Sequence, residues 1–107
     1  MPRRLPRALK RIRELAAARK VSFTLKARRE LAGSQLGLDE EDACDVLANL
    51  TPEDSAGRLK SATTGEWMYV FKPQLCATAL YVKLILRGSC VLISFHDDDG
   101  GSHEEDA

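Results

Sequence analysis

Residues 80–96 read Leu-Tyr-Val-Lys-Leu-Ile-Leu-Arg-Gly-Ser-Cys-Val-Leu-Ile-Ser-Phe-His, with apolar side chains at most alternate positions. A period of two is typical of β-strands, and Gly88-Ser89 in the middle predicts a two-residue type II′ turn. We therefore expect a hairpin. Its expected cross-strand pairs are Arg87 with Cys90, Ile85 with Leu92, Lys83 with Ser94, and Tyr81 with His96.

The two faces of this hairpin differ in chemistry. Because alternate residues share a face, one face is apolar and is expected to form the core: Leu80, Val82, Leu84, Leu86, Val91, Ile93 and Phe95. The other face gathers Tyr81, Lys83, Arg87, Ser94 and His96. A phenol, an ammonium group and an imidazole side by side suit proton transfer beside a phosphate. An ordinary half-solvated sheet shows the same alternation, so both interpretations stay open at this point.

Charge is distributed unevenly along the 107 residues, although the formal net charge is zero. Residues 1–30 hold eleven Lys and Arg against two acids, whereas residues 97–107 hold six acids and no Lys or Arg. A basic end of this kind suits a polyanion. We expect one domain over residues 1–96 and an acidic, disordered tail over 97–107.

Targeting, metal and redox signals are weak. The chain has no apolar run of about 18 residues, and its basic start is not followed by the apolar segment of a secretory signal, so we expect a cytoplasmic protein without a membrane span. Cys44, Cys76 and Cys90 are odd in number and lack a C-x-x-C spacing, which predicts small buried side chains rather than disulfides or a zinc site. With two histidines in the chain, no metal or other cofactor is expected.

The first third of the chain carries helix signals. Leu9, Ile12 and Leu15 recur at helical spacing after Pro6, which fits the first turn of a helix. The remaining arc of this helix is basic, with Arg7, Lys10 and Arg11. These side chains form either a solvated face or a surface that lies along a phosphate backbone.

Two further helices and three more extended segments are expected. Val21–Phe23 reads as a short strand, Thr24 as the N-cap of a helix through Leu36, and Asp39 as the N-cap of a third helix. Arg58–Thr64 and Trp67–Phe71 read as strands, and Trp67 is expected in the core of the second one. The order predicts an α+β domain: three N-terminal helices packed on one face of a mainly antiparallel sheet that ends in the long hairpin.

Several motifs occur in a fixed order along the chain: Leu36-Gly37-Leu38-Asp39, Lys60-Ser61-Ala62-Thr63-Thr64, Trp67, Val70-Phe71-Lys72-Pro73, Tyr81-Val82-Lys83 and Ile93-Ser94-Phe95. In this order and spacing they resemble the MqsR-type toxins of bacterial type II toxin–antitoxin pairs, a branch of the RelE-like ribonucleases. The resemblance runs from about Leu5 to Phe95. It implies a RelE-like fold and an endoribonuclease that cuts messenger RNA next to GC dinucleotides and is neutralised by an MqsA-like antitoxin with a helix-turn-helix domain.

The resemblance also implies site residues. The family's catalytic positions correspond to Lys60, Tyr81 and His96. Met68 and His96 stand where the best-studied member of the family has Gln and Lys. Metal-free RNA cleavage needs a base for the ribose 2′-OH, a cation for the crowded phosphorane and an acid for the leaving 5′-oxygen. Histidine changes charge near neutral pH, which suits the proton transfers. RNA binding is expected from Lys83, Arg87, Arg7, Lys10 and Arg11.

Two other functions remain open. One is an RNA-binding or ribosome-associated module without catalysis, in which the same cations act only electrostatically. The other is a DNA-binding regulator, which ranks lowest because no helix pair carries a recognition-helix pattern. We expect no specific DNA binding by the chain without its antitoxin.

Overall fold

Within residues 4–34 and 36–98, which the computed structural model describes, the chain forms three α-helices and a sheet of six strands. The helices are α1 (Arg4–Ala17), α2 (Leu25–Ala32) and α3 (Glu40–Ala48), followed by the short 3₁₀ helix η1 (Pro52–Asp54). The strands are β1 (Val21–Phe23), β2 (Ser55–Lys60), β3 (Trp67–Phe71), β4 (Gln74–Leu75), β5 (Thr78–Leu86) and β6 (Cys90–Asp97). The predicted α+β class is confirmed.

The sheet is mixed. Its order is β1-β6-β5-β3-β2, and the short β4 pairs with β5. Neighbouring strands are antiparallel except β1, which runs parallel to β6. The expected mainly antiparallel arrangement is therefore correct for all but one pair of strands, and β4 was not predicted.

Side-chain caps start the second and third helices where the sequence predicted. Thr24 Oγ1 accepts a hydrogen bond from Ala27 N at 3.1 Å. Asp39 and Asp42 form a reciprocal capping box at 2.9 and 3.0 Å, and the backbone N–H of Asp42 lowers the pKa of the Asp39 carboxyl. The second helix is shorter than expected and ends at Ala32, where Gly33 caps it.

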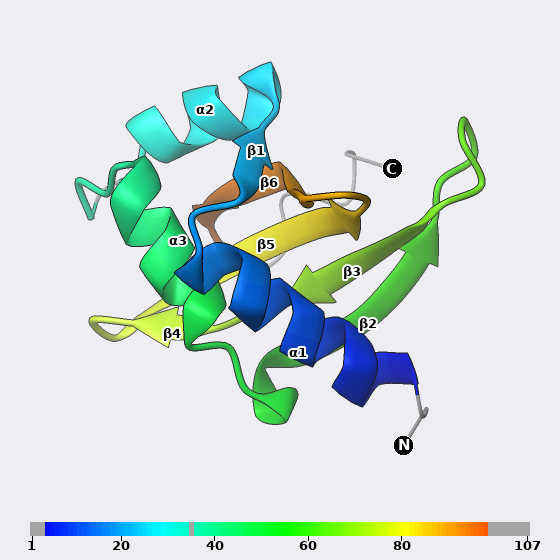
Figure 1. Cartoon of the computed structure of the whole chain (residues 1–107). Coiled ribbons are helices and arrows are strands. Elements are labelled where there is room, and N and C mark those ends of the chain that lie inside the picture. Colours follow the sequence, from blue (N-terminus) through cyan, green and yellow to red (C-terminus); the bar gives the residue numbers. More distant parts are fainter. Residues whose placement is uncertain (1–3, 35, 99–107) are drawn as a thin grey trace.

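The helices lie around the sheet in two different ways. Figure 1 shows α1 and α3 crossing the same face of the sheet, while α2 lies beside the edge formed by β1 and β6. Arg19, which follows α1, links α1 to α3 through ion pairs with Asp45 at 2.8 Å and with Glu41 at 3.0 Å. The expected packing of all three helices on one face is therefore not confirmed: α1 and α3 share a face, whereas α2 covers an edge.

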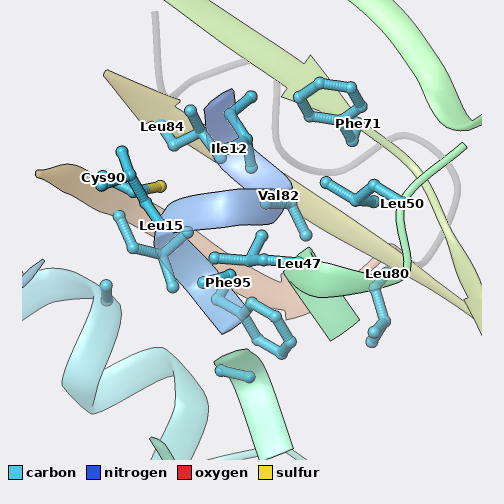
Figure 2. Close-up of a cluster of buried hydrophobic side chains, with 14 of the residues drawn as sticks. Ile12, Leu15, Leu47, Leu50, Phe71, Leu80, Val82, Leu84, Cys90 and Phe95 are labelled. Atoms are coloured by element: carbon cyan, nitrogen blue, oxygen red, sulfur yellow. The ribbon is translucent and has the colours of Figure 1, made fainter. Parts of the chain in front are cut away.

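One apolar core lies between the helices and the sheet. Figure 2 shows Ile12 and Leu15 of α1 and Leu47 of α3 packed with side chains of β5 and β6. Fully buried members include Ile12, Leu47, Val82 and Phe95. α2 adds Ala27 and Leu31 to the same core from the edge. Burial of this apolar surface is the main source of stability.

The hairpin register differs from the prediction near its turn. Leu86 pairs with Cys90, so the loop has three residues, and the φ of Gly88 is not positive as a type II′ turn requires. The expected pairs of Arg87 with Cys90 and of Ile85 with Leu92 are therefore wrong. Ile85 pairs with Val91 instead.

A β-bulge restores the predicted register further from the turn. Leu84 pairs with Leu92 and Lys83 with Ser94, so Ile93 is the extra residue on β6. Before the bulge, Cys90 and Leu92 face the core, and the expected core positions Val91 and Ile93 do not belong to it. After the bulge, Phe95 faces the core as predicted.

Three strand boundaries also differ, the first being the start of β2 at Ser55 rather than Arg58. β2 ends at Lys60 rather than Thr64, because Ser61 Oγ accepts from the backbone N–H groups of Thr63 and Thr64 at 3.3 and 3.2 Å and closes a turn. β6 extends to Asp97, and Asp98 N donates to Ala79 O at 2.8 Å, so the first two residues of the expected tail join the sheet. Residues 99–107 of that tail lie outside the described residues.

Candidate functional site

Tyr81 and His96 form a stacked pair on the face of the sheet opposite α1 and α3. They are direct cross-strand neighbours, their ring centroids lie 5.1 Å apart, and their ring planes are inclined by 22°. Their neighbours Val82 and Phe95 point into the core, so strand alternation directs both rings away from it. The predicted pairing of these two residues is confirmed.

The backbone determines which nitrogen of His96 carries the proton in the neutral ring. His96 Nδ1 lies 2.9 Å from the carbonyl oxygen of Asp97. A carbonyl can only accept, so Nδ1 is the donor and Nε2 holds the lone pair. Tyr81 is only 8% exposed. The phenol of Tyr81 and the imidazole of His96 are thus stacked, and the imidazole has a defined tautomer. This geometry is suited to proton transfer.

Three lysines reach the same face of the sheet as this pair, and two of them were missed by the sequence analysis. Lys83 pairs with Ser94, as predicted, and is 8% exposed. Lys72, which follows β3, places Nζ 6.0 Å from the Tyr81 ring centroid and 3.5 Å from Asp98 Oδ2. Lys26 of α2 reaches the same face from the edge, with Nζ 2.7 Å from Ser94 Oγ. Because Phe71 faces the core, strand alternation would have placed Lys72 on the face of Tyr81 once the pairing of β3 with β5 was known. Nothing in the sequence indicated that Lys26 reaches this face.

Lys60 lies elsewhere. It pairs with Trp67, and Tyr69 pairs with the core residue Leu84, so Lys60 belongs to the face that carries α1 and α3. It also lies near the Leu86 end of β5, five residues from Tyr81, which is about 17 Å at 3.4 Å per residue. The structure therefore does not bring Lys60 together with Tyr81 and His96.

Two cations of β2, Arg58 and Lys60, lie over the ring of Trp67. The guanidinium carbon of Arg58 lies 3.9 Å from the Trp67 ring centroid and Lys60 Nζ lies 5.4 Å from it, both within the range of cation–π interaction. Trp67 is half-buried and is not part of the core. The prediction that it is a core residue is wrong: Tyr69 packs against the core cluster, whereas Trp67, two residues earlier on β3, does not.

The other expected RNA-binding residues are also apart from the stacked pair. Arg87 makes a two-pronged ion pair with Glu66 at 2.6 and 2.9 Å, which lowers the pKa of Glu66 to about 2. Arg7, Lys10 and Arg11 are exposed on α1, on the helix side of the sheet. Of the expected site residues, the structure brings together Tyr81, His96 and Lys83.

The three thiols of the chain differ in burial. Within residues 4–34 and 36–98, no three His, Cys, Asp or Glu side chains are grouped as metal ligands would be. Cys44 and Cys90 are buried, and burial raises the pKa of Cys90 to about 12, which makes it unreactive at neutral pH. Cys76 is exposed, contrary to the expectation that all three thiols are buried. Among the described residues, no helix is long and apolar enough to cross a membrane.

Comparison with known proteins identifies the family. The sequence profile of the family described as "Motility quorum-sensing regulator, toxin of MqsA" matches residues 6–97, which include every strand and the stacked pair. The chain belongs to this family. It is similar to the mRNA interferase toxin MqsR of Escherichia coli (strain K12), with 29% identity over 102 residues covering 91% of this chain and 99% of the relative. The resemblance in the sequence motifs is confirmed.

Proposed function

We propose that this chain is the toxin of a toxin–antitoxin pair and acts as an mRNA endoribonuclease. Membership of a toxin family and likeness to an mRNA interferase support the class. The observation that carries the activity is the stacked Tyr81–His96 pair with Lys72, Lys83 and Lys26 around it on one face of the sheet.

The proposed reaction is transesterification that needs no metal ion. The ribose 2′-oxygen attacks the adjacent phosphorus, the bond from phosphorus to the 5′-oxygen breaks, and the products are a 2′,3′-cyclic phosphate and a 5′-hydroxyl. One member of the Tyr81–His96 pair takes the 2′-OH proton and the other gives a proton to the leaving oxygen. Lys72 and Lys83 stabilise the extra negative charge of the phosphorane.

Cations outside this face are proposed to bind RNA away from the reacting phosphate. The family resemblance implies a catalytic role for Lys60, but its neighbours Arg58 and Trp67 support a role in holding the strand by charge and stacking. Arg7, Lys10 and Arg11 on α1 offer a phosphate-binding surface. Arg87 contributes less, since Glu66 already neutralises it. The preferred cleavage sites are proposed to contain GC.

The alternative is an RNA-binding module without catalysis. Incubating the purified protein with a GC-containing RNA in EDTA distinguishes the two. The endoribonuclease yields discrete fragments with cyclic-phosphate ends, and a 2′-deoxy substitution at the cleaved nucleotide abolishes them. Tyr81→Phe protein purified in parallel controls for contaminating ribonucleases. Binding without fragments would support the alternative and reject the proposed function.

The partner is proposed to be an MqsA-like antitoxin, with a helix-turn-helix domain, produced from a neighbouring reading frame. The family description, a toxin of MqsA, supports this pairing. Expression of the chain alone should arrest bacterial growth, and co-expression of the neighbouring frame should restore it. Growth that is unaffected by the chain, at a level where soluble protein accumulates, would argue against a toxin.

A further inference from the structure

The part of β6 that carries His96 has no strand on its outer side among the described residues. β1 pairs with β6 only from Cys90 to Leu92, and β6 continues to Asp97. An unpaired strand edge leaves backbone N–H and C=O groups that need partners. Figure 1 shows α2 lying beside this edge, directly after β1.

Beyond the end of β1, the outer edge of β6 is bonded by side chains of α2, by Thr24 before this helix and by Ser34 after it. Thr24 Oγ1 donates to the Ile93 carbonyl at 3.3 Å, Lys26 Nζ donates to Ser94 Oγ at 2.7 Å, and Ser34 Oγ donates to Asp97 Oδ1 at 3.2 Å. Glu30 contacts the backbone of the residue that precedes His96. Its Oε1 accepts from the backbone N–H of Phe95 at 2.9 Å, while its Oε2 binds Lys26 Nζ at 2.7 Å.

The register of this segment decides where His96 points. The bulge at Ile93 separates two registers that differ by one residue. If the register near the turn continued to the end of β6, His96 would oppose Leu80 on the core face and Phe95 would oppose Tyr81. Burial of Phe95 favours the observed register. The Glu30 carboxylate favours the same register, because the Phe95 N–H faces α2, and can donate to Glu30, only in that register.

We propose that Glu30 is a positioning residue for His96: its carboxylate holds the free edge of β6 in the bulged register that keeps His96 stacked on Tyr81. Lys26 supports this arrangement, because its ammonium group forms an ion pair with Glu30 and a hydrogen bond with Ser94 of β6. Glu30 bonds the backbone N–H of Phe95, so it acts through the backbone that joins Phe95 to His96. This inference rests on the proposed function for its effect on cleavage, but its structural part does not.

Three substitutions and one control test the role of Glu30. Glu30→Gln keeps an oxygen that accepts from Phe95 N, whereas Glu30→Leu removes it and Glu30→Asp withdraws it while keeping the charge. The control is Glu40→Gln, which breaks the 3.3 Å ion pair between Arg28 of α2 and Glu40 of α3 and leaves Glu30 and Lys26 unchanged. Circular dichroism checks folding. Glu30→Asp retains the test should Glu30→Leu not fold.

The expected result is a loss in kcat rather than in KM. Misplacement of a reacting group by about 1 Å can cost a hundredfold in rate, so Glu30→Leu and Glu30→Asp should lower kcat about tenfold or more. KM should stay within about twofold, and Glu30→Gln should recover most of kcat. The control should match the wild type. Equal kcat in Glu30→Leu and wild type, or an equal loss in the Glu40→Gln control, overturns the proposal.

An NMR measurement tests the positioning without any activity. Stacking on Tyr81 shifts the ring protons of His96, and a His103→Gln background leaves His96 as the chain's single histidine. The shift should persist in Glu30→Gln and shrink in Glu30→Leu and Glu30→Asp; an unchanged shift in all three overturns the proposal. If the wild type cleaves no RNA, the proposed function fails and this measurement still decides the role of Glu30.

Discussion

Tyr81 and His96 are stacked across β5 and β6 with their ring centroids 5.1 Å apart. The two rings belong to adjacent strands of one hairpin, so their contact is determined by the backbone register and does not depend on long, mobile side chains. Each ring can exchange a proton. This pair is therefore the first place to test the proposed cleavage.

Tyr81→Phe should lower RNA cleavage by more than about tenfold, because it removes the phenolic proton and keeps the stacked ring. A fluorogenic RNA substrate measures kcat/KM. The matched control is Tyr69→Phe, which removes a phenolic hydroxyl from β3 on the opposite face, beside Leu84. Equal rates in wild type and Tyr81→Phe would place the proton transfer on another residue.

His96 should give the cleavage rate a pH dependence, because a histidine changes charge between about pH 5 and 8. We expect a limb in this range that rises with pH if His96 is the base and falls if it is the acid. His96→Lys should flatten this limb and keep some activity through its charge. The measurement is a pH–rate profile for the two proteins and for His96→Ala; identical profiles for His96→Ala and wild type would make His96 a bystander.

Lys72 and Lys60 should affect different kinetic constants. Lys72 lies beside Tyr81, so Lys72→Gln should lower kcat by about tenfold or more through loss of charge stabilisation. Lys60 lies on the other face next to Trp67, so Lys60→Ala should mainly raise KM and weaken the dependence of RNA binding on salt. A large kcat loss in Lys60→Ala with a normal Lys72→Gln would return the catalytic cation to Lys60.

Glu66 should make stability depend on acid pH. Arg87 lowers the pKa of Glu66 to about 2 from 4.5, so the unfolded chain binds more protons than the folded one between these values. The ion pair's contribution is complete above about pH 4.5 and is lost as the pH falls toward 2. The free energy of unfolding, measured with urea, should differ less between pH 2.5 and pH 5.5 for Glu66→Gln than for the wild type. Equal differences would mean that the pair does not stabilise the fold.

Leu47→Ala should destabilise the protein by about 2–5 kcal/mol, because Leu47 is fully buried where α3 meets the sheet and its loss leaves a cavity. Leu25→Ala is the control, since Leu25 is 64% exposed and the same truncation should cost less than about 0.5 kcal/mol. Urea denaturation with an unchanged m-value measures both. Similar losses in the two variants would contradict the assignment of the core.

The sequence predicted the features that depend on near neighbours. The caps at Thr24 and Asp39 were predictable because each bonds a backbone N–H three residues away. The opposition of Tyr81 and His96 was predictable because alternation and a short turn constrain a hairpin. That prediction held although the turn and the bulge were both missed, since the longer loop and the extra residue at Ile93 offset each other.

The tertiary structure decided which distant residues share a face. Lys72 joins Tyr81 and Lys60 joins Trp67 only through the pairing of β3 with β5 and of β2 with β3, and the alternation within one strand does not specify its partner. The bulge at Ile93 and the contact of Glu30 with the β6 edge likewise depend on packing between segments 65 residues apart in the chain. Local periodicity determines which side chains of a strand point the same way; the burial of the core determines which strands and helices lie beside them.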